Sequence, residues 1–89
     1  MERLHVIVEG IVQGVGFRQF TLHEAQRLRL GGWVKNRYDR RVEVVAEGTH
    51  DHLAELLSVL CEGPPASVVQ NVHITWEKAT GEFSTFSIS

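Results

Sequence analysis

The pattern of apolar and polar positions divides the 89-residue chain into strand-like and helix-like segments. Strands are predicted where β-branched residues cluster or where apolar and polar residues alternate. These segments are residues 4–9, 33–38, 42–47, 72–76 and 86–88. Helices are predicted where apolar or small residues recur at helical spacing. These are residues 18–30 and the segment that carries Leu53, Leu56, Leu57 and Leu60.

Residues that favour turns and helix ends separate these segments. Two glycines at 31–32 are expected to end the first helix, and Thr49 is a suitable N-cap for the second. A Gly-Pro-Pro sequence at 63–65 closes the second helix, and a tight turn is expected at residues 39–40. The element order is therefore β-α-β-β-α-β, with a short extra strand at the end.

This order is that of the split βαβ, ferredoxin-like arrangement. It predicts an α+β fold in which both helices cover one face of an antiparallel sheet, and the chain length fits a single domain over residues 1–89. Alternation places Trp33 and Trp76 in strands, where we expect them to fill the core. Cys61, at the end of the leucine-bearing helix, is expected to be a small buried hydrophobe.

The composition narrows the classes of partner. Eleven acidic and nine basic residues give a formal net charge of -2, which argues against binding a nucleic-acid backbone through many cations. An RNA-binding version of this fold needs a basic sheet with exposed aromatic residues, and residues 41–47 provide neither. The single cysteine excludes an internal disulfide, and no apolar run approaches the roughly 20 residues needed to cross a bilayer. We therefore expect a cytoplasmic protein without nucleic-acid or membrane partners.

The segment from Gly10 to Arg18 carries the clearest sign of chemistry. Its glycines let the main chain curl so that successive N–H groups point inward, and it leads into a helix start, which favours anions. Arg18 adds a planar cation suited to two phosphate oxygens. Neither the Walker pattern nor the dinucleotide-binding pattern is present, so these residues alone also fit a tight turn with a surface arginine.

Asn36 is the second candidate. It falls on the strand after the first helix, and in the split βαβ topology this strand can return toward the glycine-rich segment. Its amide oxygen can hold a water while its NH2 group donates to a substrate oxygen. An isolated asparagine here equally fits a turn contact at a strand end. No metal site is expected, because His50 and His52 lie two positions apart and so do not share a helix face.

Three groups of residues resemble the acylphosphatases. They are Gly10-x-Val12-Gln13-Gly14-Val15-x-Phe17-Arg18, Leu28-x-Leu30-x-Gly32-Trp33-Val34-x-Asn36 and Gly81-Glu82-Phe83-x-x-Phe86. The resemblance covers nearly the whole chain. It implies the hydrolysis of acyl phosphates to a carboxylate and inorganic phosphate, without a metal or cofactor.

The same resemblance implies roles for individual residues. The phosphoryl group is expected to be held by Arg18 and by backbone N–H groups of the loop Gln13, Gly14, Val15, Gly16, Phe17 and Arg18. Asn36 is expected to position the attacking water. The expected partner is a small acyl phosphate, and the chain is expected to be a monomer. Neither the group that ends at Arg18 nor the group that ends at Asn36 contains a histidine or carboxylate among its matched residues, so we expect a phosphoryl oxygen of the substrate to accept the water's proton.

The chain departs from the family pattern in one turn. The family usually has Asp-Gly in the turn after the asparagine strand, whereas this chain has Asp39-Arg40. A positive φ at Arg40 would cost about 1 kcal/mol or somewhat more.

Acylphosphatase-like domains also occur inside larger carbamoyl-transfer proteins. The alternative to an enzyme is therefore a non-catalytic or regulatory module that binds phosphate or carbamoyl phosphate.

Overall fold

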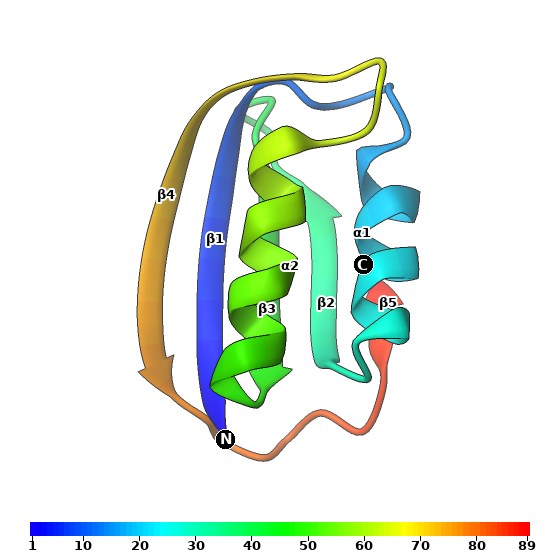
Figure 1. Cartoon of the computed structure of the whole chain (residues 1–89). Helices are drawn as coiled ribbons and strands as arrows, with labels where there is room; N and C mark the ends of the chain where they lie inside the picture. Colours follow the sequence, from blue (N-terminus) through cyan, green and yellow to red (C-terminus); the bar gives the residue numbers. More distant parts are fainter.

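A computed structural model describes residues 1–89 and contains two helices packed on one face of a five-stranded sheet (Figure 1). The strands are β1 (Glu2–Ile11), β2 (Gly31–Asn36), β3 (Val42–Gly48), β4 (Val68–Lys78) and β5 (Phe86–Ile88). The helices are α1 (Phe17–Arg27) and α2 (His50–Glu62). The predicted α+β, ferredoxin-like fold is confirmed. Neither helix is long and apolar enough to span a membrane.

The strand order in the sheet is β4-β1-β3-β2-β5. β1 pairs antiparallel with β3 and β4, and β2 pairs antiparallel with β3, as the prediction requires. The extra strand β5 pairs parallel with β2, so the complete sheet is mixed. Figure 1 shows the reason: β4 stops at the bottom of the sheet, where β2 starts. The connection runs along the bottom of the sheet, so β5 starts there too and runs in the same direction as β2.

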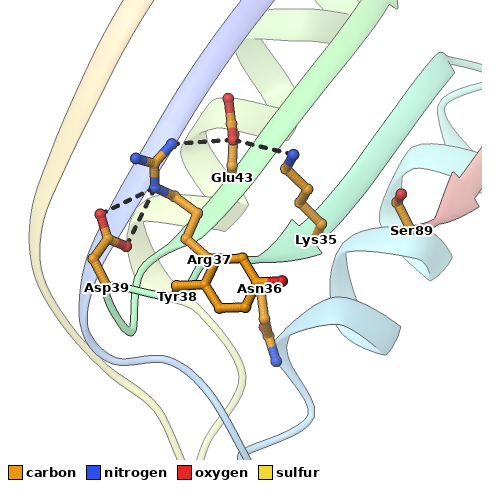
Figure 2. Close-up of a pocket in the computed structure, with 7 residues that line it drawn as sticks. All are labelled: Lys35, Asn36, Arg37, Tyr38, Asp39, Glu43 and Ser89. Atoms are coloured by element: carbon orange, nitrogen blue, oxygen red, sulfur yellow. Dashed lines mark hydrogen bonds and ion pairs between the residues drawn. The ribbon is translucent and has the colours of Figure 1, made fainter.

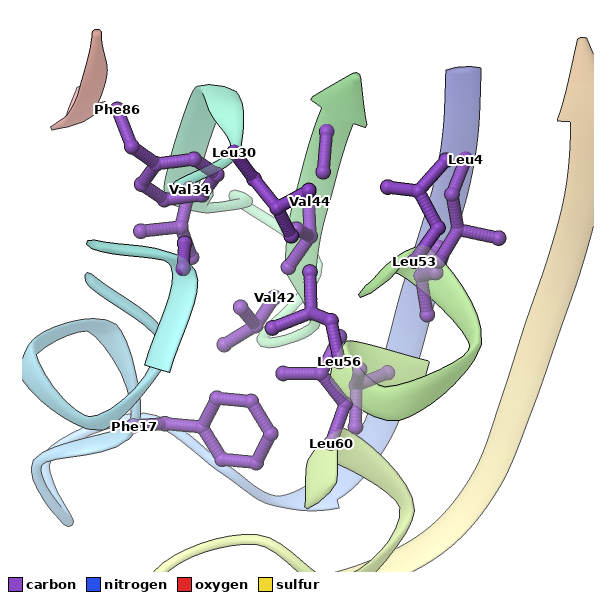
Figure 3. Packing of buried hydrophobic residues seen from close by; sticks show 14 of the residues in the cluster. Leu4, Phe17, Leu30, Val34, Val42, Val44, Leu53, Leu56, Leu60 and Phe86 are labelled. Carbon is purple, nitrogen blue, oxygen red and sulfur yellow. The ribbon is translucent and has the colours of Figure 1, made fainter. Parts of the chain in front are cut away.

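The core lies between the sheet and the two helices (Figure 3). Alternate residues of the central strands meet the apolar stripes of the helices there. Its members include Leu4, Val6, Val8, Phe17, Val34, Val44, Leu53, Leu56 and Leu60. Each such side chain stabilises the fold by about 1.5–3 kcal/mol on burial. Phe17, only 1% exposed, fixes the first turn of α1 on the sheet and thereby holds its neighbour Arg18 at the surface.

The first helix does not end at the glycine pair 31–32, contrary to the prediction. α1 ends at Arg27, and Arg29 takes the left-handed conformation with φ of 57°. The N–H groups of Arg29 and the next residue return to carbonyls of the last turn, at 3.1 and 2.9 Å, which is a Schellman motif. The glycines begin β2 instead, where a Cβ at Gly32 would lie 1.9 Å from the carbonyl oxygen of Val45.

Neither tryptophan nor Cys61 belongs to the core, so these three expectations were wrong. Trp33 is half-buried on the face of the sheet that carries no helix, with Lys35 Nζ 5.1 Å from its ring centroid. Trp76 lies on the edge strand β4, is 39% exposed and stacks on His50 at 4.7 Å. Cys61 is exposed on α2. The helices are too narrow to cover β4, and alternation within a strand does not show whether its apolar side is covered.

A buried carboxylate anchors the connection between β4 and β5. Glu47 accepts hydrogen bonds from the backbone N–H groups of Thr80 (2.9 Å) and Gly81 (3.0 Å) and from Arg3 Nε (2.8 Å). Burial raises the pKa of Glu47, but these hydrogen bonds outweigh it and hold the pKa below its ordinary value. The anchor seats β5 beside β2, which brings Ile88 to the candidate site.

Candidate active site

The loop between β1 and α1, the end of β2 and the end of β5 enclose one small pocket of about 190 Å³. It is lined by Val12, Gly14, Gly16, Phe17, Arg18, Gln19, Asn36 and Ile88. The two side chains singled out in the sequence, Arg18 and Asn36, thus lie on the same pocket. Gln13 and Val15, which were also expected to contribute backbone N–H groups, are not among the lining residues.

Two glycines shape the loop that forms one wall. Gly14 and Gly16 have φ of 74° and 80°, in the left-handed region that costs other residues about 1–2 kcal/mol. A Cβ at either position would meet no atom within 4 Å. Glycine is therefore required here by the backbone conformation rather than by crowding, and the space in front of the loop stays open to a ligand.

The first turn of α1 offers free hydrogen-bond donors to this pocket. Its N-cap is Gly16, no side chain caps it, and no acidic residue lies in its first turn. The second helix shows the opposite arrangement, since Thr49 Oγ1 accepts from His52 N–H and Asp51 lies in the first turn. The start of α1 thus retains unpaired N–H groups and the positive end of the helix dipole, which together favour an anion.

Arg18 supplies the positive charge at the pocket. Its side chain is exposed and forms neither a hydrogen bond nor an ion pair with the rest of the chain. Arg37 and Arg41, by contrast, are both paired with Asp39. The guanidinium of Arg18 is therefore free to bind two oxygens of a phosphoryl group.

Asn36 occupies the opposite wall, at the last residue of β2. Its Oδ1 is buried and is the only buried side-chain polar atom that lacks a hydrogen-bond partner. Figure 2 shows this side chain extending toward the loop that precedes α1, away from Arg37 and Glu43. An unpaired buried acceptor costs about 1–3 kcal/mol, so its presence requires an explanation. This acceptor is available to a hydrogen-bond donor that enters the pocket.

A second cavity of about 520 Å³ adjoins the first, and Asn36 borders both. Its cations are already neutralised by carboxylates. Hydrogen bonds from Arg41 hold the pKa of Asp39 well below its usual range. Burial raises the pKa of Glu43, but the hydrogen bond and charge of His5, with Arg37, outweigh it and keep this pKa low. The β2–β3 turn thus carries a solvated cluster of mutually paired charges.

One contact at the site was missed by sequence reasoning. Gln13 was assigned only a backbone role, but its side-chain Nε2 donates to the carbonyl oxygens of Arg37 (2.8 Å) and Arg41 (2.9 Å). Main-chain carbonyls are present at every residue, so no pattern of residue types could indicate these acceptors. The lining residues Val12, Gln19 and Ile88 were missed as well, because they gather only through the tertiary fold.

Comparison with known proteins decides the family. The acylphosphatase family model matches residues 4–88 of this chain. The chain belongs to the acylphosphatase family. The resemblance drawn from the sequence motifs is thereby confirmed.

Individual acylphosphatases match over nearly their full length. The acylphosphatase of Pelotomaculum thermopropionicum is 46% identical, with 98% of this chain and 95% of the relative covered. That of Dehalococcoides mccartyi strain CBDB1 is 49% identical, with 99% and 98% covered. The crystal structure of acylphosphatase from Bacillus subtilis superposes with a TM-score of 0.96 at 42% identity, covering 100% of this chain and 99% of that one.

A larger protein also contains this fold. The structure of full-length HypF in its phosphate- and nucleotide-bound form matches with a TM-score of 0.88 at 30% identity. The match covers 100% of this chain and 12% of the HypF chain. The acylphosphatase fold therefore occurs both as nearly the whole of a protein and as a small part of one.

Proposed function

We propose that this chain hydrolyses acyl phosphates to a carboxylate and inorganic phosphate, in the pocket shared by Arg18 and Asn36. Family membership supports the reaction class. The observation that carries the assignment of residues is the pocket itself, which has a free guanidinium and open helix N–H groups on one side and an unpaired carboxamide oxygen on the other.

The cationic side of the pocket binds the phosphoryl group. The N–H groups at the start of α1 and in the loop at Gly14 and Gly16 accommodate its oxygens, and Arg18 binds two of them at once. Phosphoryl transfer passes through a loose transition state with charge spread over the equatorial oxygens, so these donors stabilise the transition state in place.

The carboxamide side binds the nucleophile. The Oδ1 atom of Asn36 accepts a hydrogen bond from a water, which fixes the water oxygen toward phosphorus. As the water oxygen bonds to phosphorus, the bond between phosphorus and the acyl oxygen breaks, and its electron pair leaves with the carboxylate. The conjugate acid of that leaving group has a pKa of about 4, so it departs without a general acid.

The proton of the water passes to a phosphoryl oxygen of the substrate. No histidine or carboxylate lines the pocket, and His23 is exposed on α1 outside it. We expect a pH–rate profile of kcat with no enzyme group near neutrality. An ionisation near neutrality that disappears in His23→Ala would contradict this step.

The test is a continuous assay with benzoyl phosphate in the presence of a chelator, with inorganic phosphate as a competitive inhibitor. Asn36→Ala is expected to lower kcat about 100-fold while the inhibition constant of phosphate stays close to that of the parent. Arg18→Ala removes two charged hydrogen bonds and is expected to weaken phosphate binding about 100-fold or more. Asn71→Ala on β4 is the matched control. An Asn36→Ala protein with the parent rate would refute the role of Asn36.

The same assay separates the enzyme from a binding module. HypF was captured with phosphate bound, and this chain matches only a small part of it, so phosphate binding alone is the second candidate function. Tight phosphate binding without turnover of benzoyl or carbamoyl phosphate would favour that module.

We further propose that the chain is one domain that works as a cytoplasmic monomer on a small substrate. One copy of the chain places both Arg18 and Asn36 on the pocket, so the proposed site does not need a residue from a second copy. The free, exposed thiol of Cys61 fits a reducing compartment. Light scattering at the assay concentration tests the monomer, and activity that rises with association of the chain would contradict it.

A further inference from the structure

We propose that Gln13 is a positioning residue, whose side chain ties the phosphate-binding loop to the β2–β3 turn and thereby sets the distance between Arg18 and Asn36. This inference rests on the proposed function, because it concerns how the two walls of that pocket are held together. It assigns a role to a side chain that does not itself line the pocket.

The contacts of Gln13 join two segments that the sheet does not connect. Its Nε2 donates to the carbonyl of Arg37, the residue directly after Asn36, at 2.8 Å. It also donates to the carbonyl of Arg41, the residue before β3, at 2.9 Å. Both donors of one amide group are thus used, and they reach both arms of the turn. The half-buried side chain therefore lies at the turn end of the hairpin.

This link lies where the sheet ladder stops. The last paired residues of β2 and β3 are Asn36 and Val42. Beyond them the turn is closed by the Arg37 N–H, which donates to the Arg41 carbonyl at 2.8 Å, and by Arg40 N–H to Arg37 oxygen at 3.3 Å. The carbonyls of Arg37 and Arg41 that take part in this closure are the same two that accept from Gln13.

The side chain of Asn36 has no other support. Its Oδ1 has no partner in the protein, and no hydrogen bond of its amide nitrogen is formed with the rest of the chain. No hydrogen bond therefore fixes this side chain, and its position follows that of the backbone at the end of β2. The loop before Arg18 is held by buried Val12 and Phe17, but between them no atom lies within 4 Å of a Cβ position at Gly14 or Gly16. Gln13 is the hydrogen-bonded connection between these two walls.

Loss of this connection should affect the chemical step more than binding. The loop N–H groups and Arg18 still hold the phosphoryl group, whereas the water held by Asn36 loses its alignment. A displacement of 1 Å in such a position costs about 100-fold in rate. We expect Gln13→Met to lower kcat by about 10- to 100-fold, and to change the inhibition constant of inorganic phosphate by less than about threefold.

The experiment compares two variants with a matched control. Gln13→Met keeps the length of the side chain without its donors, and Gln13→Glu keeps its shape but presents only acceptors to the two carbonyls. Gln70→Met, on the exposed edge strand β4, is the control. Each variant is used only if its circular dichroism melt lies well above the assay temperature, and Gln13→Glu serves if Gln13→Met does not fold. The parent is first shown to hydrolyse benzoyl phosphate, so a failure of the proposed function appears there and not in the variants.

A double-mutant cycle with Asn36→Ala decides whether Gln13 acts through Asn36. In the Asn36→Ala background, Gln13→Met is expected to change kcat by less than about twofold, because the residue it positions is gone. Retention of the parent kcat in a folded Gln13→Met protein would overturn the proposal. So would an equal loss in both backgrounds, or a loss of phosphate binding as large as the loss of kcat, because each would place the effect elsewhere than in the alignment of Asn36.

Discussion

Replacement of Arg40 by glycine should stabilise the protein, although it removes a charged side chain from the surface. Arg40 has φ of 69° in the turn between β2 and β3, in the left-handed region where a Cβ is strained. The turn is a three-residue hairpin connection of the kind that favours glycine at this position. The side chain of Arg40 is exposed and makes no ion pair, so little is lost with it.

The size of the effect follows from two opposing terms. Relief of the left-handed conformation contributes about 1–2 kcal/mol to the free energy of unfolding. The greater freedom of glycine in the unfolded chain takes back about 0.4–1 kcal/mol. We expect a net gain of up to about 1.5 kcal/mol, and the midpoint of about 0.8 kcal/mol raises the Tm of a domain this small by about 3–6 °C.

Urea unfolding and thermal melts of three variants test this reasoning. Arg40→Ala removes the same charge but keeps the Cβ, and its stability should stay within about 0.3 kcal/mol of the parent. Arg29→Gly relieves the other positive φ, 57°, but also removes a cation from the C-terminal end of α1. Its gain should therefore be smaller than that of Arg40→Gly. If Arg40→Ala stabilises as much as Arg40→Gly, repulsion among neighbouring arginines and not backbone strain is the cause, and the argument fails.

Three further outcomes are expected. Glu47→Gln should lower the free energy of unfolding by about 2 kcal/mol, because it weakens charged hydrogen bonds to Thr80, Gly81 and Arg3, and a melt with Gln70→Met as control measures this. The pKa of Glu47 is below its ordinary 4.5 in the folded protein, so its contribution is complete above that pH and is lost as pH falls further. Urea unfolding should therefore show that the free energy of unfolding falls more between pH 6 and pH 4 in the parent than in Glu47→Gln. An equal fall in both proteins would show that Glu47 does not contribute to this pH dependence. Gly16→Ala should cost about 1–2 kcal/mol and weaken phosphate binding, whereas D-alanine at this position, introduced by chemical synthesis, should cost less because a D-residue adopts a positive φ without this strain.

The order of elements could be predicted from the sequence because its signals are local. The leucine stripe of α2, the Thr49 cap and the alternating strands all depend on neighbours a few positions apart, and each was found where expected. The sequence analysis tied a cost in stability at Arg40 to a positive φ, and the φ there is positive. Local periodicity and turn chemistry therefore carry most of the fold.

The errors arose where one residue can satisfy two different local rules. The glycines at 31–32 look like a helix stop, yet the close approach of the Val45 carbonyl places them in a strand, and Arg29 ends the helix in spite of its Cβ. Trp76 alternates like a core residue, but it lies on an edge strand that the helices cover only in part. Whether helices cover a strand depends on how the layers pack in the folded protein, and a short stretch of sequence does not show this.

The candidate site could be predicted only in part for the same reason. Arg18 and Asn36 were named because their motifs are specific, and the fold places both on one pocket. The side-chain contacts of Gln13 go to backbone carbonyls in another element, so they could not be anticipated from residue types. Ile88 reaches the pocket only because β5 pairs with β2, which itself depends on the Glu47 anchor.

The pocket draws its walls from segments that lie far apart in the sequence, Val12 just after β1 and Ile88 in β5. During synthesis, which proceeds at about 5–20 residues per second, the glycine-rich loop is made seconds before β5, the strand that carries Ile88. A ribosome-bound chain that still lacks its final strand has the guanidinium but no closed cavity around it. Acquisition of activity should consequently wait until β5 has been made and has paired with β2, and should not follow directly from the appearance of the motifs.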